Sequence, residues 1–211
     1  MASPGRMRNT LERQLRRSRR LFGEDHKITV NAKIQLAQYY DRHGYWAEAL
    51  GVWQDALGSI TRRREADSET RWHIEFSIGR LYRELDRPQD ALPVLRRVAD
   101  YFSERFGEDD RRTIGAMSWV GGTLRKLGDY EGALDVCRTV VASCTEALGG
   151  DDPATLDAMA SLIICLGRCN EFVEARALLV TLLERRTRLL GADDPKTRWA
   201  ESILATYPDQ P

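Results

Sequence analysis

The sequence predicts an all-α chain in which antiparallel helix pairs repeat along a right-handed superhelical solenoid. The first observation is a 42-residue internal period, marked by two series, Ala49, Ala91, Ala133, Ala175 and Asp25, Asp67, Asp109, Asp151, Asp193. The second is apolar spacing of the i, i+3, i+4, i+7 type, without a sustained strand alternation. The third is composition, because 42% hydrophobic and 30% charged residues are typical of a folded chain.

Glycine and aspartate mark where each period turns from one helix to the next. Glycine ends a helix because it tolerates the left-handed cap, and the following aspartate caps the next helix by accepting backbone N–H bonds. Four aspartates follow a glycine by two residues, and Glu65 takes the place of the glycine before Asp67. Pro153 and Pro195 suit the first helical position, where a missing N–H costs nothing. We therefore expect a first helix, helix A, to begin near residues 27, 69, 111, 153 and 195, and a second, helix B, near residues 46, 88, 130 and 172.

These boundaries predict one repeat array over residues 1–211 with about ten helices. It comprises a half-repeat helix B (6–22), four full repeats (27–64, 69–106, 111–148 and 153–190) and a closing helix A (195–206). An array that opens on a half-repeat suggests a homodimer through that end, or a piece of a longer protein. Small residues should let the paired helices approach closely, in helix B at the alanine series and in helix A at Ala37, Gly79 and Gly121.

Four segments carry a family resemblance: Phe22-Gly23-Glu24-Asp25-His26, Leu148-Gly149-Gly150-Asp151-Asp152-Pro153, Leu190-Gly191-Ala192-Asp193-Asp194-Pro195 and Ala91-Leu92-Pro93-Val94-Leu95. The chain resembles the tetratricopeptide repeats of kinesin light chain and its bacterial relatives, whose unit is also 42 residues long. The resemblance covers nearly the whole chain. It implies a protein-binding scaffold whose concave groove is lined by helix A.

Several functions are not expected. The three histidines accompany no catalytic or phosphate-binding motif, so we expect neither an enzyme nor a cofactor. Equal numbers of basic and acidic residues, 32 each, disfavour direct nucleic-acid binding, and no apolar run is long enough for a membrane helix. The four cysteines are Cys137, Cys144, Cys165 and Cys169. They lack the close pairing of a metal or redox motif, which favours buried, reduced thiols and a cytoplasmic location. A metal or disulfide site is the alternative, because the two helices that carry these cysteines should pack together.

The expected groove is basic and carries aromatic residues. Counting from the small position of each helix A gives the inward residues Asn31, Gln35, Gln38, Arg42, His73, Phe76, Ser77, Arg80, Arg83, Trp119, Arg125, Lys126, Ser161, Arg168 and Trp199. Four of them, Arg80, Arg83, Arg125 and Lys126, are expected to form a basic stripe flanked by Phe76 and Trp119. Such a surface favours an acidic peptide with apolar anchors. The alternatives are a ligand-sensing or regulatory repeat domain of a bacterial signalling or transcription regulator, and a small-molecule-binding biosynthetic protein.

Overall fold

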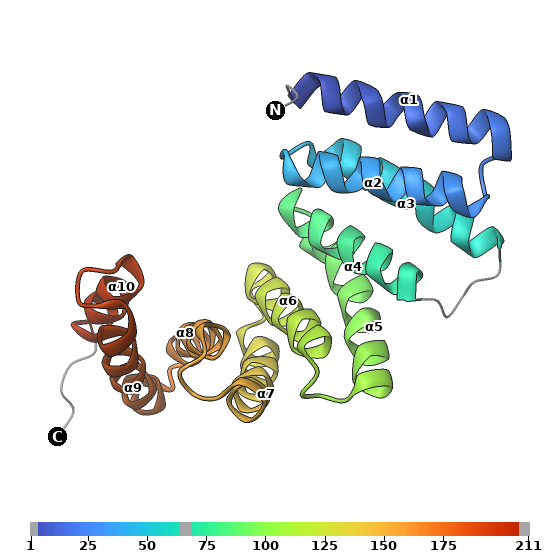
Figure 1. Cartoon of the computed structure of the whole chain (residues 1–211). Helices are drawn as coiled ribbons and strands as arrows, with labels where there is room; N and C mark the ends of the chain where they lie inside the picture. The colour runs from blue at the N-terminus through green and yellow to red at the C-terminus, as the bar shows by residue number, and fades with distance from the viewer. Residues whose placement is uncertain (1–3, 64–68, 207–211) are drawn as a thin grey trace. The chain divides into compact units, whose positions relative to one another are not determined.

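The computed structural model describes residues 4–63 and 69–206, and all regular structure in these ranges is helical (Figure 1). The ten described helices are α1 (Pro4–Phe22), α2 (Lys27–Arg42), α3 (Trp46–Arg62), α4 (Glu69–Glu84), α5 (Pro88–Phe106), α6 (Arg111–Leu127), α7 (Tyr130–Leu148), α8 (Pro153–Arg168), α9 (Phe172–Leu190) and α10 (Pro195–Leu204). The predicted fold class is confirmed. Glu65 and Asp67, with the expected end of the first repeat at residue 64, lie outside the described residues.

The chain forms two compact units, Met1–Val98 and Ala99–Pro211, and the boundary between them falls within α5. In the first unit α2 packs against α1 and α3. In the second unit α7 packs against both α6 and α8, and α9 packs against α8 and α10. Sequential helices therefore pair within each unit, whereas one continuous array over the whole chain stays a prediction.

The helix A caps lie one residue later than expected. The side chains of Asp110, Asp152 and Asp194 accept the backbone N–H two residues ahead of them, and His26 does so before α2. The residue directly before the helix has the extended backbone, near φ −64° and ψ 138° at Asp152, that turns its side chain onto the first turn. The aspartates of the periodic series do not cap α2, α6, α8 or α10, so for these four helices that prediction was wrong by one position.

The aspartates of the periodic series instead bind arginines. Asp25 accepts two hydrogen bonds from Arg62 at the end of α3, and Asp151 accepts one from Arg188 of α9. The Arg62 guanidinium lowers the pKa of Asp25 to about 2. These two contacts fasten the turn before α2 to the end of α3, and the turn before α8 to the end of α9.

Small residues bring the two helices of a pair together, as the sequence predicted. The four alanines of the helix B series are fully buried. A Cβ added to Gly79 of α4 would lie 2.7 Å from Leu95 Cδ2 of α5, closer than two carbon atoms can pack. The absence of a side chain at Gly79 therefore sets the distance between α4 and α5.

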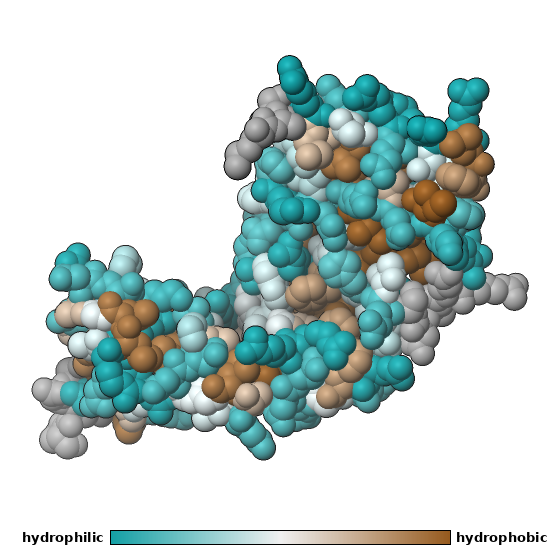
Figure 2. Space-filling view, viewed as in Figure 1, coloured by the Kyte–Doolittle hydropathy of each residue, from teal (hydrophilic) through white to brown (hydrophobic). Residues whose placement is uncertain are grey.

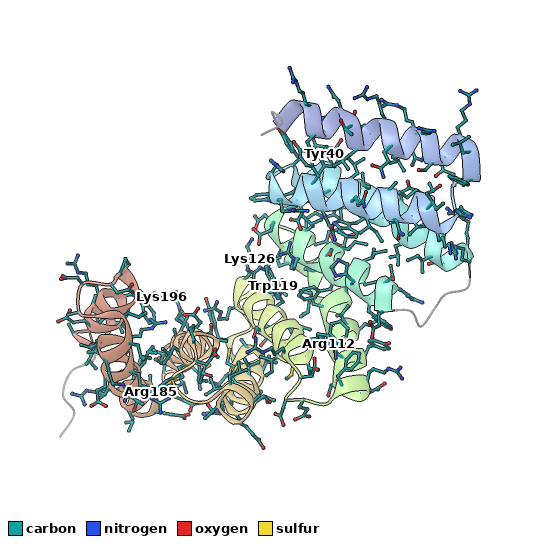
Figure 3. All side chains as sticks on the ribbon, in the orientation of Figure 1. Tyr40, Arg112, Trp119, Lys126, Arg185 and Lys196 are labelled. Atoms are coloured by element: carbon teal, nitrogen blue, oxygen red, sulfur yellow. The ribbon has the colours of Figure 1, made fainter. Side chains whose placement is uncertain are left out.

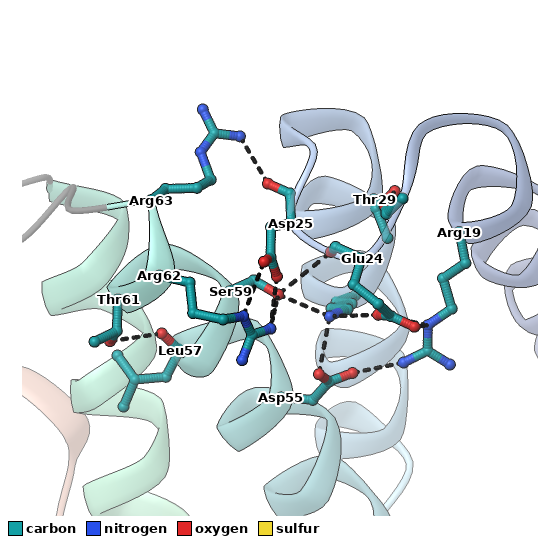
Figure 4. Close-up of polar contacts among 12 residues, drawn as sticks. Arg19, Glu24, Asp25, Thr29, Asp55, Leu57, Ser59, Thr61, Arg62 and Arg63 are labelled. Carbon is teal, nitrogen blue, oxygen red and sulfur yellow. Dashed lines mark hydrogen bonds and ion pairs between the residues drawn. The ribbon is translucent and has the colours of Figure 1, made fainter.

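A buried lysine ties α1, α2 and α3 together (Figure 4). The Lys33 side chain is 0% exposed, and its Nζ lies 2.9 Å from Asp55 Oδ1, 2.9 Å from Ser59 Oγ and 3.0 Å from Glu24 Oε2. Arg19 of α1 reaches the other Asp55 oxygen at 2.6 Å. These partners compensate the cost of burying the ammonium group.

The second repeat reverses the charges of this pair. Glu75 and Arg97 lie 42 residues after Lys33 and Asp55, and they form an ion pair of 3.1 Å between α4 and α5. Glu75 is buried, as Lys33 is. A helix A from one of these repeats would therefore meet a like charge if it paired with the helix B of the other.

Candidate partner-binding surfaces

In the first unit, α1 and α2 enclose a shallow hollow of about 420 Å³. Three residues of the predicted groove line it: Gln35, Gln38 and Arg42. Asn31, one turn earlier on α2, is exposed. The Gln35 amide oxygen accepts a weak 3.4 Å hydrogen bond from Gln14 of α1. The hollow therefore combines amide groups and one guanidinium with the apolar side chains of Met7, Leu11 and Tyr39.

The predicted residues of α4 are partly occupied by contacts inside the first unit. Arg80 forms a 2.7 Å ion pair with Asp41 of α2. Ser77 is buried, and its hydroxyl donates to the His73 carbonyl at 2.9 Å. Phe76 and Arg83 are half-buried. The free surface of α4 is therefore smaller than its sequence pattern indicates.

His73 lies at the edge of the first unit's core. Its ring meets Trp53 edge to face, with the centroids 5.6 Å apart. Burial lowers the pKa of His73 below its ordinary value, and the positive charge of Arg80 lowers it further. This imidazole is therefore biased towards its neutral form, which can both donate and accept a hydrogen bond.

In the second unit, Trp119 and Lys126 project from α6 (Figure 3). Lys126 is exposed and Trp119 half-buried. Arg125 differs, because its Nε is buried and has no hydrogen-bond partner among the described residues. The Arg125 charge acts on the thiols of Cys137 and Cys165, in α7 and α8.

The three helices α6, α7 and α8 enclose a hollow of about 470 Å³. Ser161, a predicted groove residue, lines it with Ser118 of α6. Gly121 and Gly122 present backbone to the hollow, and Cys137 contributes a thiol. The wall combines apolar side chains with two hydroxyls, one arginine, Arg111, and the carboxylates of Asp152 and Asp157.

A hollow of about 840 Å³ lies among α8, α9 and α10. Figure 2 shows apolar surface over the α9–α10 part of this unit. The predicted residues Arg168 and Trp199 line the hollow, and among the lining residues that the sequence did not indicate are Phe172, Val173, Arg176 and Ile203. Val173 is 76% exposed, and Phe172 is also exposed. Two adjacent large apolar residues at the start of a helix B, outside its buried stripe, were the signal that could have revealed them.

Positive charge dominates this hollow. Arg168 and Arg176 are its two charged lining residues, and no described lining residue is acidic. The Arg168 guanidinium lies 5.4 Å from the Tyr130 ring centroid and makes no ion pair among the described residues. The buried Arg186 of α9 lies 5.7 Å from the Trp199 ring centroid. The site thus combines apolar side chains with the Arg168 guanidinium, which contacts Tyr130 and makes no ion pair among the described residues.

Within residues 4–63 and 69–206, no group of three or more His, Cys, Asp or Glu side chains could hold a metal ion. None of the described helices is long and apolar enough to cross a membrane. The predicted basic stripe has two members in each unit, so it stays a prediction.

Comparison with known sequences and folds identifies the repeat. A tetratricopeptide repeat family model matches residues 113–154, which span α6, α7 and the start of α8. No curated protein sequence matches the chain.

Solved structures share the fold at low identity. One solved structure, from Podosopora anserina, contains TPR-like repeats that are nearly identical to one another and is described as a kinesin light chain. It is 16% identical to this chain, with a TM-score of 0.78 and 89% of each chain covered. BtubC (BKLC) from P. vanneervenii is 15% identical, with a TM-score of 0.71 over 100% of this chain and 96% of its own. YrrB, a TPR protein with an unusual peptide-binding site, is 21% identical, with a TM-score of 0.60 over 92% and 84%. The period, the helix pairs and these matches together show that the chain has the tetratricopeptide repeat fold, and that residues 113–154 match the repeat's sequence pattern.

Proposed function

We propose that the chain is a protein-interaction scaffold that binds a peptide segment of its partner, and that the α8–α10 hollow receives this peptide. The observation that carries the proposal is the lining of the hollow. Phe172, Val173 and Trp199 offer apolar contact beside Arg168, and no described lining residue is acidic. A peptide with a large apolar side chain next to a carboxylate fits this chemistry.

The physical argument concerns what each contact costs. Burying apolar area contributes roughly 25 cal/mol per Å², and tryptophan and arginine commonly dominate interface energies. Arg168 can hold a carboxylate through two parallel hydrogen bonds without first breaking an ion pair. Arg80 would have to leave Asp41 before it could do the same. We therefore assign the main anchor to the second unit.

Two similar folds support peptide recognition as the mode. YrrB is a TPR protein with an unusual peptide-binding site, and a Rap protein has been crystallised with Competence and Sporulation Factor, with a TM-score of 0.63. The hollow of about 840 Å³ lies within the size range of ligand sites. The partner would be an acidic protein segment with apolar anchors.

The test begins with partners captured from lysate and continues with titration of the identified peptide. Arg168→Ala and Val173→Glu should each weaken binding at least about tenfold, since a lost central contact commonly costs 1–2 kcal/mol or more. Val173→Glu places a negative charge in the wall of the hollow, where it repels the carboxylate of the peptide. Because Val173 is exposed, this substitution should leave the fold intact.

Matched controls separate the hollow from the rest of the surface. Leu189→Glu adds the same charge at an exposed position of α9 outside the hollow, and Arg17→Ala removes an exposed arginine from α1. Both should bind like the wild type. Full affinity in Arg168→Ala and Val173→Glu would show that the peptide binds elsewhere. Arg80→Ala and Arg125→Ala then test whether the wider predicted groove contributes.

A second candidate function is a ligand-sensing domain of a larger regulator. It is favoured by the likeness to the Rap structures, of whose chains the match covers 52% and 55%. Here the hollow would hold a free peptide or small molecule rather than a segment of a folded partner. Mass spectrometry of the captured material distinguishes the two, because a scaffold retains an intact protein.

A further inference from the structure

Two thiols meet in the core of the second unit. The Cys137 Sγ of α7 lies 3.8 Å from the Cys165 Sγ of α8. The side chains are almost completely buried, with 6% of Cys137 and 0% of Cys165 exposed. Neither cysteine takes part in the proposed peptide site.

A small molecule can approach one of these sulfur atoms. Cys137 lines the 470 Å³ hollow enclosed by α6, α7 and α8. Gly121 of α6 lines the same hollow beside this thiol, since a Cβ added there would lie 3.5 Å from the Cys137 Sγ. No side chain of residue 121 therefore stands between the hollow and the sulfur. Cys165 lies behind Cys137, away from the hollow's lining.

The hydrogen bond between the two thiols shifts their pKa values in opposite directions. It lowers the pKa of Cys137, and the positive charge of Arg125 lowers it further. The same bond and burial raise the pKa of Cys165, and they outweigh the lowering effect of the Arg125 charge there. The accessible thiol is thus also the one that ionises first. Thiolates, rather than thiols, are the nucleophiles of cysteine chemistry.

We propose that Cys137 and Cys165 form a peroxide-responsive dithiol, in which Cys137 reacts first and Cys165 resolves the product. The Cys137 thiolate attacks one oxygen of hydrogen peroxide, the O–O bond breaks, and hydroxide leaves and is protonated to water. The resulting sulfenic acid is then attacked by the Cys165 sulfur, which forms the S–S bond and expels a second water. The two thiols lose two electrons and two protons in all, and one peroxide is reduced to two waters.

The bond would link α7 to α8 beneath the hollow. A disulfide requires its sulfur atoms at about 2 Å, so the helices must move closer from the 3.8 Å contact. Such a movement changes the wall of the α6–α8 hollow, because Cys137 and Val140 of α7 and Ser161 of α8 line it. Oxidation would thereby couple a redox signal to the shape of this hollow.

The experiment uses the full chain and hydrogen peroxide as the probe. After treatment, the denatured protein is alkylated and analysed by mass spectrometry. The protein should have lost two hydrogens, two of its four thiols should remain free, and one cross-linked peptide should contain Cys137 and Cys165. This product should form at least about tenfold faster than oxidation of Cys144 or Cys169, since reactivity follows thiolate character and access. Cys144 and Cys169 have raised pKa values, mainly through burial.

Two variants test the order of the steps. Cys165→Ser should stop at a sulfenic acid on Cys137 that a sulfenic-specific reagent traps, and Cys137→Ser should abolish the fast reaction. Cys144→Ser is the matched control from the same helix and should form the cross-link at the wild-type rate. Two results with the wild-type chain would overturn the proposal: oxidation of all four thiols at similar rates, or a first oxidation product at Cys169. Because no partner is present, either result is independent of peptide binding.

Discussion

Gly79 and Gly121 occupy the same position of helix A in successive repeats, yet we predict opposite effects when each is replaced by alanine. At Gly79 the new Cβ would lie 2.7 Å from Leu95 Cδ2 and 2.8 Å from its Cγ. Leu95 is fully buried, so its side chain has little room to move. At Gly121 the nearest atoms are Val136 Cγ1 at 3.4 Å and Cys137 Sγ at 3.5 Å, which are ordinary contacts.

The size of each effect follows from two opposing terms. Alanine in a helix interior is favoured over glycine by about 1 kcal/mol. Overpacking a filled core costs about 1–3 kcal/mol. Gly79→Ala should therefore lower the free energy of unfolding by up to about 2 kcal/mol, whereas Gly121→Ala should raise it by up to about 1 kcal/mol.

Urea unfolding followed by circular dichroism measures both changes. Gly51→Ala in α3 and Gly115→Ala in α6 are the controls, because a Cβ at either position meets nothing within 4 Å. They report helix propensity alone in each unit. Equal stability of Gly79→Ala and Gly51→Ala would refute the argument, since it would mean that α4 and α5 separate without cost.

Three further predictions concern charge and metal. Asp55→Ala should lower the free energy of unfolding by about 1–3 kcal/mol, because the buried Lys33 ammonium loses a carboxylate; Lys33→Met should cost less in the same urea assay, since Met117 and Met159 occupy the equivalent position in later repeats. His73 should titrate below its ordinary 6.5 in an NMR experiment. As pH falls through 6.5 the unfolded chain therefore takes up the proton first, the free energy of unfolding decreases until the folded pKa is reached, and His73→Gln should remove that decrease. Protein purified without chelator should contain no stoichiometric zinc by elemental analysis, and a chelator should leave the melting temperature unchanged; one zinc per chain would contradict the assignment of the cysteines.

Helix starts were predictable from sequence because they depend on short-range chemistry. Glycines with φ between 87° and 90° end α1, α5, α7 and α9, and Pro153 and Pro195 open α8 and α10. The cap was misplaced by one residue because two adjacent aspartates are chemically alike. Only the backbone angle at Asp152 shows which carboxylate can turn onto the helix.

The candidate site was only partly predictable. Counting along helix A identified Arg168 and Trp199, but not Phe172 and Val173, which belong to helix B. Sequence spacing shows which residues share a face of one helix, whereas a hollow is formed where three helices meet. The ion-pair partners of Arg80 and Lys33 could not be predicted for the same reason, since Asp41 and Asp55 lie in other helices.

The sequence by itself determined the period, the helix pairs and the small positions between them, because turns, caps and apolar stripes are set by residues a few positions apart. Tertiary packing alone decided which small position is obligatory. Gly79 faces Leu95, whereas Gly121 faces the smaller Cys137. It also brought Cys137 within 3.8 Å of Cys165 and left Arg168 without an ion pair among the described residues. These properties depend on distances between side chains of different helices, and such distances exist only once the helices have packed.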